Sequence, residues 1–346
     1  MFTFLKKQQS SKVIIAGESA TLEVPRGKTM LEAMLADGLA MPHDCKVGSC
    51  GTCRFKLVEG KIGELSPSAL VLERDALSQG YRLACQAMPR SDLVIALDAP
   101  LSRQQAVERF SATIVATPRL CPDIIQLVVE LDRPIRFIPG QYADLTAPGI
   151  AEPRSYSFAF APDRGEATRL EFHVRHVPGG LFTDWLFGEE RTGGTLELSG
   201  PFGQFRLKDS AEAMLCLAGG SGLAPIMAIL QHARSLGASR PVTLLYGART
   251  QQHLYCLGEI EALRSAWNAP FEFIPVLSEE DERSGWTGAR GLVTDPIARL
   301  AGLARTEAYL CGPPAMIDAA EAQLVQQGVL PELVAADRFL DKSTTR

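Results

Sequence analysis

Four cysteines in the first quarter of the chain constrain its fold more than any other feature. Cys45, Cys50 and Cys53 have the spacing C-x4-C-x2-C, and Cys85 follows further on. Thiolates in this pattern hold a plant-type 2Fe-2S cluster, which accepts and passes single electrons. A zinc site usually pairs two closely spaced ligand couples and fits less well. A disulfide is disfavoured because no secretory signal opens the chain. The other cysteines are scattered, and ordinary burial is expected for each except Cys311.

Length and charge bound the class of protein. A chain of 346 residues suggests two or three domains, and 46% hydrophobic residues supply ample core. The 35 basic and 40 acidic side chains give a net charge of −5 without a basic run, so no nucleic-acid partner is expected. No apolar stretch approaches the roughly 18 residues that cross a bilayer. We therefore expect a cytoplasmic protein, and a monomer by default.

The first 98 residues are expected to form a compact domain. Apolar runs at 13–15 and 20–24 predict a hairpin, and Thr29 and Gly38 mark the start and end of a helix. Further strands are expected at 54–58 and 93–97. Residues 1–98 carry 12 basic and 11 acidic side chains, a balance of +1. Such near-neutrality suits a ferredoxin joined to its electron source, because a separate one is steered by a strong field.

A linker and then a barrel are expected next. The polar segment 98–109 contains a proline and reads as a linker. From about 110 to 207 the hydrophobic residues alternate with a period of two, as in 124–131 and 170–174. This alternation, interrupted by Gly and Pro, predicts an antiparallel β-barrel.

Two motifs within the barrel region suggest a flavin. Arg154, Tyr156 and Ser157 offer a guanidinium for a pyrophosphate, a ring for the isoalloxazine and a hydroxyl for its reactive nitrogen. A chance strand is an equal alternative for these residues alone. Gly180 then leads into a helix for which Thr183 is the expected cap, and such a helix start binds anions. An ordinary capped helix is the commoner case, but both motifs together favour flavin binding.

From residue 211 onward, short apolar strands alternate with helices, which predicts a parallel sheet. The strand at 214–218 runs into the loop Gly219-Gly220-Ser221-Gly222, and a helix is expected from Pro225. A strand, a glycine loop and a helix in this order bring phosphate against bare backbone. The motif is weak alone, because Pro225 replaces the last glycine of G-x-G-x-x-G. Leu223 excludes a G-x-S-x-G nucleophile elbow.

Further strands are expected at 242–246, 271–276 and 308–311, and a strand-like segment at 333–339 ends in an aromatic residue. Ligands of open parallel sheets bind at the carboxyl ends of the strands. Cys311 is therefore expected at the mouth of a binding site.

The order of these motifs resembles the ferredoxin–NADP reductase superfamily, specifically oxygenase reductases with an N-terminal plant-type ferredoxin. The resemblance covers nearly the entire chain. The stretches PHDCKVGSCGTC, FHVRHVPGG, YGART with LYCLGEIEAL, and YLCGPP with ADRF are most similar to electron-transfer components of the xylene monooxygenase type. It implies a multidomain α+β and α/β fold: a β-grasp ferredoxin (1–98), an antiparallel FAD-binding β-barrel (106–208) and a parallel-sheet NAD-binding domain (209–346).

The resemblance also implies a role for each matching residue. The 2Fe-2S ligands would be the four cysteines named first. FAD would be held by Arg154, Tyr156, Ser157, His173, Val174, Arg175, Gly180 and Thr183. The dinucleotide would be held by Gly219, Gly220, Ser221, Gly222, Cys311, Gly312 and Phe339. Ser157, Cys311 and Asp337 would be catalytic, beside the nicotinamide. Asp337 stands where plant-type members have Glu, and a tail follows Phe339.

An acidic loop bears on the choice between NADH and NADPH. Where NADPH-using relatives place Ser-Arg, this chain has Ser278-Glu279-Glu280-Asp281-Glu282. Carboxylates there repel a 2′-phosphate dianion, which favours NADH. A merely solvated acidic loop is the alternative. Arg249 in the neighbouring loop argues for NADPH, because it is able to meet a phosphate.

The implied function is stepwise electron transfer. A hydride brings two electrons while the cluster accepts one, so the flavin must convert between them. We predict transfer from NADH to FAD to 2Fe-2S and then to a terminal oxygenase or hydroxylase component. The leading partner is a membrane-embedded di-iron monooxygenase of aromatic or alkyl hydrocarbons, reached by docking without membrane insertion. The alternatives are a Rieske dioxygenase or soluble phenol hydroxylase as partner, and a redox sensor without turnover.

Overall fold

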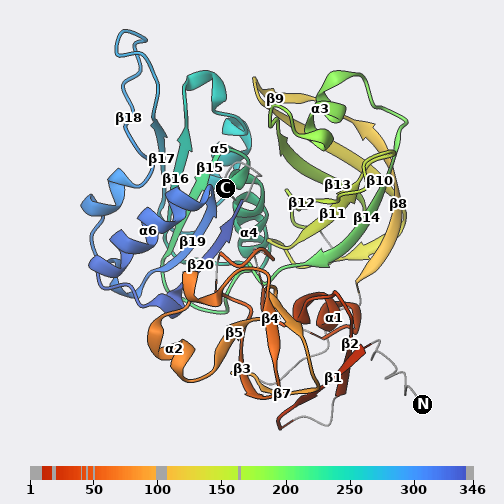
Figure 1. Ribbon diagram of the computed structural model, residues 1–346. Coiled ribbons are helices and arrows are strands. Elements are labelled where there is room, and N and C mark those ends of the chain that lie inside the picture. The colour runs from red at the N-terminus through yellow and green to blue at the C-terminus, as the bar shows by residue number, and fades with distance from the viewer. Residues whose placement is uncertain are drawn as a thin grey trace, which may run out of the picture. The chain divides into compact units, whose positions relative to one another are not determined.

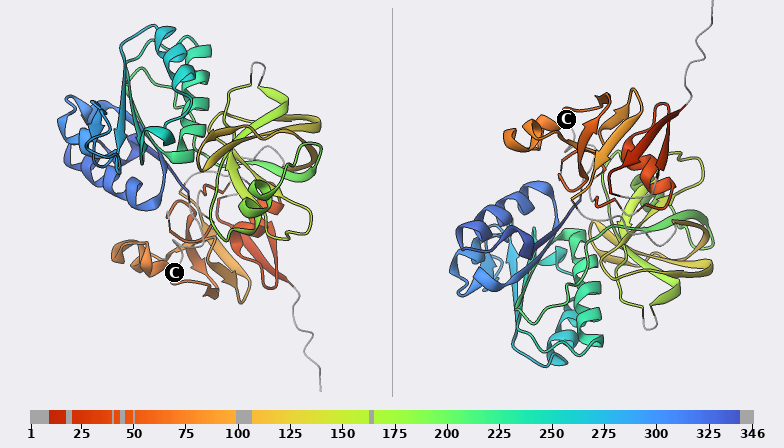
Figure 2. Two further views of the ribbon diagram at one scale, coloured as in Figure 1. Left: turned by 90° about the horizontal axis from the view of Figure 1, so that it is seen from above. Right: turned by 90° about the horizontal axis from the view of Figure 1, so that it is seen from below.

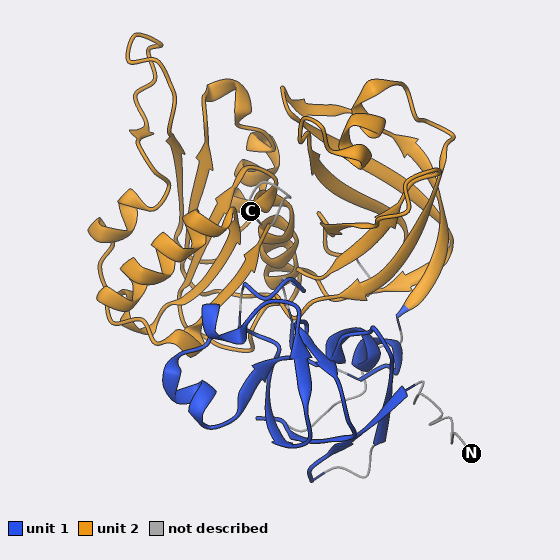
Figure 3. Cartoon of the chain, viewed as in Figure 1, with its two compact units in different colours: residues 1–107 blue, residues 108–346 orange. Residues whose placement is uncertain are grey.

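The computed structural model describes residues 10–17, 21–39, 41–43, 46–49, 51–98, 107–162 and 165–339. The chain divides into two compact units, residues 1–107 and 108–346 (Figure 3). Most of the expected linker, residues 99–106, lies outside the described residues. Each unit has its own hydrophobic core, so each is described by itself.

Unit 1 contains a mixed five-stranded sheet in the order β2-β1-β7-β3-β5 and a two-stranded sheet, β4-β6. Its elements are β1 (Ser10–Ile15), β2 (Thr21–Pro25), α1 (Met30–Ala36), β3 (Arg54–Glu59), β4 (Ile62–Glu64), α2 (Arg74–Ser78), β5 (Tyr81–Leu83), β6 (Ala87–Pro89) and β7 (Leu93–Ala96). The first two strands are antiparallel, and the first and last are parallel. The expected hairpin and small sheet are confirmed.

Helix α1 is fixed by its ends. The Thr29 side chain accepts a hydrogen bond from the Glu32 backbone N–H, and the Glu32 carboxylate accepts one from the Thr29 backbone N–H. This capping box satisfies two backbone donors that the helix leaves without partners. Gly38 takes a φ of +74°, the left-handed conformation that commonly follows a helix. The expected start and end of this helix are confirmed.

The first half of unit 2 is an antiparallel sheet that curls into a barrel. Its elements are β8 (Glu108–Ala116), β9 (Arg119–Cys121), β10 (Ile124–Arg136), β11 (Tyr142–Thr146), β12 (Arg154–Ser157), β13 (Glu166–Arg175), α3 (Leu181–Gly188) and β14 (Thr195–Phe202). The strand order is β12-β11-β14-β8-β10-β13, and β9 pairs with β10. Phe158, just after β12, pairs with Phe172 on β13, which brings the two ends of the sheet together. The expected antiparallel barrel is confirmed.

Helix α3 begins earlier than its sequence suggests. Gly180, in an extended conformation, is the residue that precedes the first helical turn, and Thr183 is the third residue of the helix. The Thr183 hydroxyl accepts from the Val177 N–H and donates to the Val177 carbonyl. The expectation that Thr183 caps this helix is therefore wrong, because its hydroxyl ties down the preceding turn instead.

The second half of unit 2 is a parallel sheet in the order β18-β17-β16-β15-β19-β20. Its elements are β15 (Met214–Gly219), α4 (Leu223–Ser235), β16 (Val242–Ala248), α5 (Leu257–Ser265), β17 (Phe271–Leu277), β18 (Ala289–Arg290), β19 (Glu307–Gly312), α6 (Pro314–Gln326) and β20 (Val334–Arg338). Residues 220–222 form a 3-10 turn that runs directly into α4. This helix was predicted to begin at Pro225, but it begins two residues earlier, at Leu223.

Helix α4 lies between the parallel sheet and the barrel, as Figure 1 and the two views of Figure 2 show. Ile226 and Leu230 of this helix share a hydrophobic cluster with Ile124 of β10 and with Phe205, which follows β14. The Gln231 side chain also accepts a hydrogen bond from the Ala161 N–H at 3.0 Å. The two halves of unit 2 are therefore packed together on a continuous core.

Within the part of the chain that the structure describes, every helix is too short or too polar to traverse a lipid bilayer.

Candidate active site

Three side chains from three strands meet where the barrel contacts the parallel sheet. Cys311 on β19 and Asp337 on β20 are paired neighbours, and Ser157 ends β12 of the barrel. The Ser157 hydroxyl donates to Asp337 Oδ2 at 3.3 Å, and the Cys311 thiol lies 3.9 Å from the same oxygen. The structure thus brings together all three residues that the sequence singled out as catalytic.

The surroundings of Ser157, Cys311 and Asp337 keep the Cys311 thiol protonated. Cys311 is fully buried and Ser157 is 5% exposed. Burial, and then the negative charge of Asp337, raise the pKa of the Cys311 thiol well above its ordinary value. Cys311 is therefore a neutral, closely packed group here and not a thiolate nucleophile.

The glycine loop after β15 is shaped by close packing. A methyl group on Gly222 would overlap the carbonyl oxygen of Cys311, and one on Gly219 would lie 2.6 Å from the sulfur of Met316. Gly312 is similarly close to Met316, at 2.5 Å from its methyl carbon. The loop can approach β19 so closely only because these positions lack side chains.

Gly220 serves a different purpose in the same loop. Its φ is +55°, and nothing lies within 4 Å of the place where a side chain would begin. Its backbone therefore borders open space, as is required where phosphate contacts main-chain N–H groups. Ser221, at 9% exposed, follows it in the turn. This arrangement fits the expected dinucleotide cradle.

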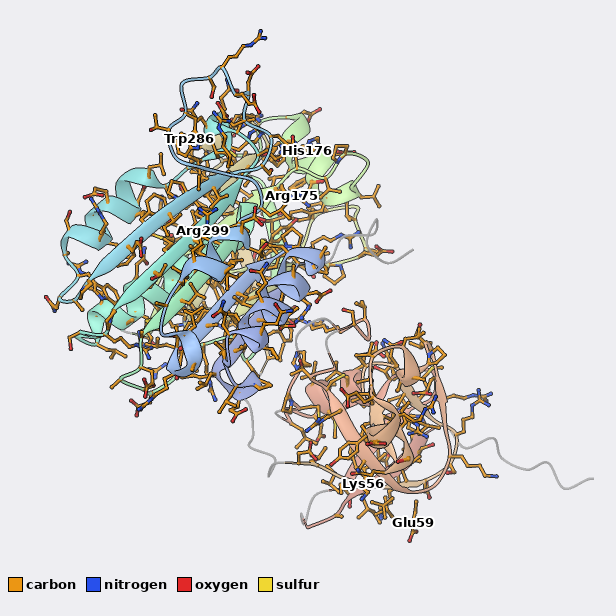
Figure 4. All side chains as sticks on the ribbon, turned by 90° about the vertical axis from the view of Figure 1, so that its left-hand side faces the viewer. Lys56, Glu59, Arg175, His176, Trp286 and Arg299 are labelled. Atoms are coloured by element: carbon orange, nitrogen blue, oxygen red, sulfur yellow. The ribbon has the colours of Figure 1, made fainter. Side chains whose placement is uncertain are left out.

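The loop opens into a pocket of about 260 Å³. Gly220 and Ser221 line it together with the loops that follow β16 and β17. Asp123 and Arg175 contribute from the barrel, and Phe339 contributes from the end of β20. Figure 4 labels Arg175 and His176 at the end of β13. Phe339, expected at the dinucleotide, and Arg175, expected along the flavin edge, therefore both line this pocket.

A hydrogen-bonded chain links the barrel to the glycine loop. The Tyr255 hydroxyl donates to the Gly220 carbonyl at 3.1 Å and lies 3.2 Å from His173 Nδ1. Burial lowers the pKa of His173 to about 4, so its ring is neutral near pH 7. Since the tyrosine proton points to Gly220, the His173 Nδ1–H donates to the tyrosine oxygen. Tyr255 lies in the stretch LYCLGEIEAL that contributes to the family resemblance, but no role was predicted for it.

A second link crosses the mouth of the pocket. Arg249 Nη2 donates to Asp123 Oδ2 at 2.8 Å and to His253 Nε2 at 2.9 Å. Asp123 belongs to the turn between β9 and β10, whereas Arg249 and His253 follow β16. Asp123 and His253 were also absent from the residues that the sequence suggested. Asp123 is 126 residues from Arg249, and the nearby His253 carries no motif of its own.

The residues expected at the flavin lie on β12, β13 and the start of α3. The Tyr156 ring contacts Phe182 with a centroid distance of 5.4 Å, which joins β12 to α3. The Arg154 guanidinium is half-buried beside it and pairs with Glu152 at 3.0 Å. The arginine, the ring and the start of the helix at Gly180 thus lie on neighbouring elements. These groups match the anionic and aromatic parts of FAD.

Val174 differs from its neighbours on β13. Its side chain is fully buried in the core of the barrel, so only its backbone can contact a cofactor. The sequence resemblance placed Val174 at the flavin edge but did not say whether its side chain or its backbone would contact the flavin.

In unit 1, the described cysteines accept hydrogen bonds. Cys53 and Cys85 are 2% and 3% exposed, and the Cys85 N–H lies 3.5 Å from the Cys53 sulfur. Gln86 Nε2 donates to the Cys85 sulfur at 3.4 Å. Converging N–H donors suit cluster-bound thiolates, whose charge they stabilise. Cys45 and Cys50 lie outside the described residues.

The cysteine loop also has the backbone expected of a tight curl. Lys46, Gly48 and Gly51 all have positive φ values, of 57°, 83° and 76°. Among the described residues no group of three His, Cys, Asp or Glu side chains is placed to hold a metal ion. The four-cysteine ligand set thus remains a prediction from the sequence.

Three family models match successive parts of the chain. They are a 2Fe-2S iron-sulfur cluster binding domain at residues 13–90, an oxidoreductase FAD-binding domain at 111–207 and an oxidoreductase NAD-binding domain at 216–322. The order is the one expected from the motifs.

Similar proteins span nearly the whole chain. The chain is 50% identical to the xylene/toluene monooxygenase electron transfer component of Pseudomonas putida, covering 96% of this chain and 94% of that protein. It is 38% identical to the phenol 2-monooxygenase reductase component of Pseudomonas sp. strain CF600, covering 95% and 94%. Among solved structures, the cytochrome P450 reductase GcoB of Amycolatopsis matches with a TM-score of 0.82 and 32% identity, covering 95% of this chain and 98% of that one.

Proposed function

Since this chain belongs to the reductase components of bacterial oxygenases, which join 2Fe-2S, FAD-binding and NAD-binding domains, we propose that it passes electrons from NADH to a terminal oxygenase. The observation that carries this proposal is the convergence of Ser157, Cys311 and Asp337 beside the glycine loop. When bound, FAD takes electrons from NADH as a pair and the 2Fe-2S cluster carries them singly.

We propose that the three converging residues position the nicotinamide. Asp337 accepts from the Ser157 hydroxyl and faces the Cys311 thiol, so it fixes both groups relative to each other. The burial of Ser157 and Cys311 helps to keep water from the place where hydride would transfer. Positioning of this kind supplies a large part of the rate in such reactions.

We assign each cofactor to residues that lie close together in the structure. We propose that Arg154, Tyr156 and the start of α3 hold FAD, and that the loop at 219–222 with Gly312 and Phe339 holds NADH. We propose Cys45, Cys50, Cys53 and Cys85 as the cluster ligands, supported by the N–H donors near the two described sulfurs. The corresponding domains are residues 1–98, 106–208 and 209–346.

The proposed partner is a membrane-embedded di-iron monooxygenase of aromatic or alkyl hydrocarbons. The 50% identity to a xylene/toluene monooxygenase component supports it over a phenol hydroxylase, whose reductase is 38% identical. We place the protein in the cytoplasm, a reducing compartment that suits a chain of eight cysteines with proposed thiolate ligands.

The internal chemistry is tested with purified protein and artificial acceptors. We expect steady NADH-dependent reduction of ferricyanide and cytochrome c. Reduction that stops after a single round would favour a redox sensor instead. Ser157→Ala and Cys311→Ala should slow the reduction of FAD by NADH in stopped flow and leave the iron–sulfur spectrum intact.

Ser155→Ala is the matched control. Ser155 is exposed on the same strand, and its hydroxyl bonds Asp144 at 2.5 Å, away from the cluster. It should reduce FAD at the wild-type rate. Unchanged kinetics in both Ser157→Ala and Cys311→Ala would refute the proposed positioning roles.

The partner is tested by reconstitution. The protein is mixed with an alkylbenzene monooxygenase, a phenol hydroxylase or a Rieske dioxygenase, and product formed per NADH consumed is measured. Tight coupling with the alkylbenzene monooxygenase alone supports the proposal, and tighter coupling with either of the others refutes this choice of partner.

A further inference from the structure

The parallel sheet gives the bound dinucleotide a direction. This step rests on the proposed function, in which the nicotinamide lies at Cys311. Cys311 is on β19, and β15 separates that strand from β16 and β17. The pocket runs from the glycine loop to Arg249, after β16, and Ser278, after β17. The adenosine half of the dinucleotide therefore extends toward these two loops.

The two loops at the adenosine end are tied together by backbone hydrogen bonds. The Ser278 N–H donates to the Ala248 carbonyl at 3.0 Å, and the Glu279 N–H donates to the Arg249 carbonyl at 2.8 Å. Arg249 is thus a direct neighbour of the acidic loop. NADH and NADPH differ only at the adenosine 2′ position, where NADPH carries a phosphate. An arginine at that place would normally favour NADPH.

Asp123 engages that arginine from the barrel. Arg249 Nη2 bears two hydrogens, and these point to Asp123 Oδ2 at 2.8 Å and His253 Nε2 at 2.9 Å. His253 is itself oriented by Thr250, whose hydroxyl lies 2.8 Å from Nδ1. Both hydrogens of this nitrogen are therefore used within the protein.

Asp123 is itself held in place. Its backbone carbonyl accepts a hydrogen bond from the His176 N–H at 2.8 Å, which fixes the turn between β9 and β10. The Cys121 thiol donates to Asp123 Oδ1 at 3.3 Å. The Asp123 side chain is 25% exposed and the Arg249 side chain is 49% exposed, so water screens part of the attraction between them.

We propose that Asp123 determines the preference for NADH by neutralising Arg249. A 2′-phosphate would have to compete with the Asp123 carboxylate for the guanidinium and also approach the carboxylates of Glu279 and Glu280. A ribose 2′-hydroxyl carries no charge and meets no such repulsion. Discrimination thus comes from a residue of the flavin barrel that acts through an arginine of the NAD-binding half.

The test compares NADH and NADPH as electron donors for ferricyanide reduction by the purified holoprotein. Asp123→Asn keeps the size and most hydrogen bonds of the side chain but removes its charge. We expect the ratio of kcat/KM for NADPH to kcat/KM for NADH to rise about tenfold, the change that about 1.4 kcal/mol represents. Inhibition by 2′,5′-ADP should tighten in parallel, whereas inhibition by 5′-ADP should not.

A double-mutant cycle separates the proposed role from a structural one. Asp123→Asn should have no effect on NADPH use when Arg249→Gln is also present, because the effect requires the guanidinium. Asp123→Glu, which retains the charge, should keep the NADH preference. Should Asp123→Asn fold poorly, Asp123→Ser provides the same loss of charge.

The outcomes distinguish this inference from the proposed function. An unchanged NADPH to NADH ratio in the charge-removing variant, with NADH still reducing the protein, overturns the role of Asp123 alone. An equal gain in NADPH use with and without Arg249 also overturns it. A wild-type protein that NADH fails to reduce overturns the proposed function itself.

Discussion

Tyr255→Phe is expected to loosen the glycine loop while preserving the packing around it. The hydroxyl bridges His173 Nδ1 and the Gly220 carbonyl. The ring packs edge-on against His173 and Tyr246, at centroid distances of 5.2 and 5.9 Å, and a phenylalanine ring keeps both contacts. The substitution therefore isolates the two hydrogen bonds.

The cost follows from the burial of the groups left behind. Tyr255 is 4% exposed and His173 is 7% exposed, so the His173 N–H is shielded from water once its partner is removed. A buried polar group without a partner costs about 1–3 kcal/mol. Gly220 is only half-buried, and water replaces part of its lost bond. We expect a loss of about 2 kcal/mol in the free energy of unfolding of unit 2.

Two measurements follow from this value. At roughly 2–4 °C per kcal/mol for a unit of this size, the melting temperature of unit 2 should fall by about 4–8 °C. Reduction of FAD by NADH in stopped flow should slow by about tenfold if about 1.4 kcal/mol of the loss reaches the transition state.

Tyr246→Phe is the control. Its ring is fully buried, and its hydroxyl lies 3.5 Å from the His253 carbonyl and interacts with the Tyr255 backbone N–H. Removing this hydroxyl should cost about 1 kcal/mol, less than the loss expected for Tyr255→Phe. Equal melting temperatures and equal reduction rates for the two variants would show that the Tyr255 hydroxyl does not hold the loop.

Three further perturbations test other parts of the structure. The pKa of His173 is lowered by burial from its ordinary 6.5 to about 4, so its contribution to stability is complete above pH 6.5 and is lost as pH falls toward 4. Wild type should lose about 2 kcal/mol more than His173→Gln between pH 7 and 5, measured by urea unfolding, and parallel curves would contradict this. Glu307→Gln leaves the charge of Arg240 without its partner at 2.9 Å, where both side chains are 4% exposed. It should lower stability by about 3–5 kcal/mol in thermal unfolding, and a shift within error would count against a buried ion pair. Gln86→Leu removes a donor to the Cys85 sulfur and should make the cluster potential more negative in a redox titration followed by electron paramagnetic resonance. An unchanged or higher potential would mean that this N–H does not act on the cluster.

Patterns that are local in the chain were the ones that predicted structure well. Alternation with a period of two depends on successive residues, so it located the barrel that includes β10 and β13. The glycine loop was found for the same reason, since a strand, its turn and the next helix are contiguous. Cys311 was expected at the mouth of the site because it ends a strand of the parallel sheet, whereas Asp337 was expected there from the family resemblance, and the structure pairs the two residues.

The predicted starts of helices α3 and α4 were less accurate. Thr183 has the residue type of a helix cap, but its hydroxyl bonds Val177 because Gly180 already occupies the capping position. The start of α4 was placed at Pro225, a residue type common in the first turn of a helix. The 3-10 turn at 220–222 extends the helical backbone to Leu223 instead.

Two contacts between the barrel and the NAD-binding half were not predicted from the sequence. Tyr255 and His173 are 82 residues apart, and Arg249 and Asp123 are 126 residues apart. Such pairs depend on how α4 packs between the two sheets, which no single-sequence pattern encodes. Arg249 shows the consequence. Considered alone, it suggested binding of the NADPH 2′-phosphate, whereas its ion pair with Asp123 supports a preference for NADH.

The position of Asp337 on β20 has a consequence for biosynthesis. Ribosomes build a chain from its amino end, so this carboxylate is added after the Ser157 hydroxyl, the glycine loop and the Cys311 thiol have all been made. A translation product that stops before Val334 would retain both partners of Asp337 without the acceptor that unites them. Such a product would also lack β20, the edge strand that pairs with β19 at Cys311.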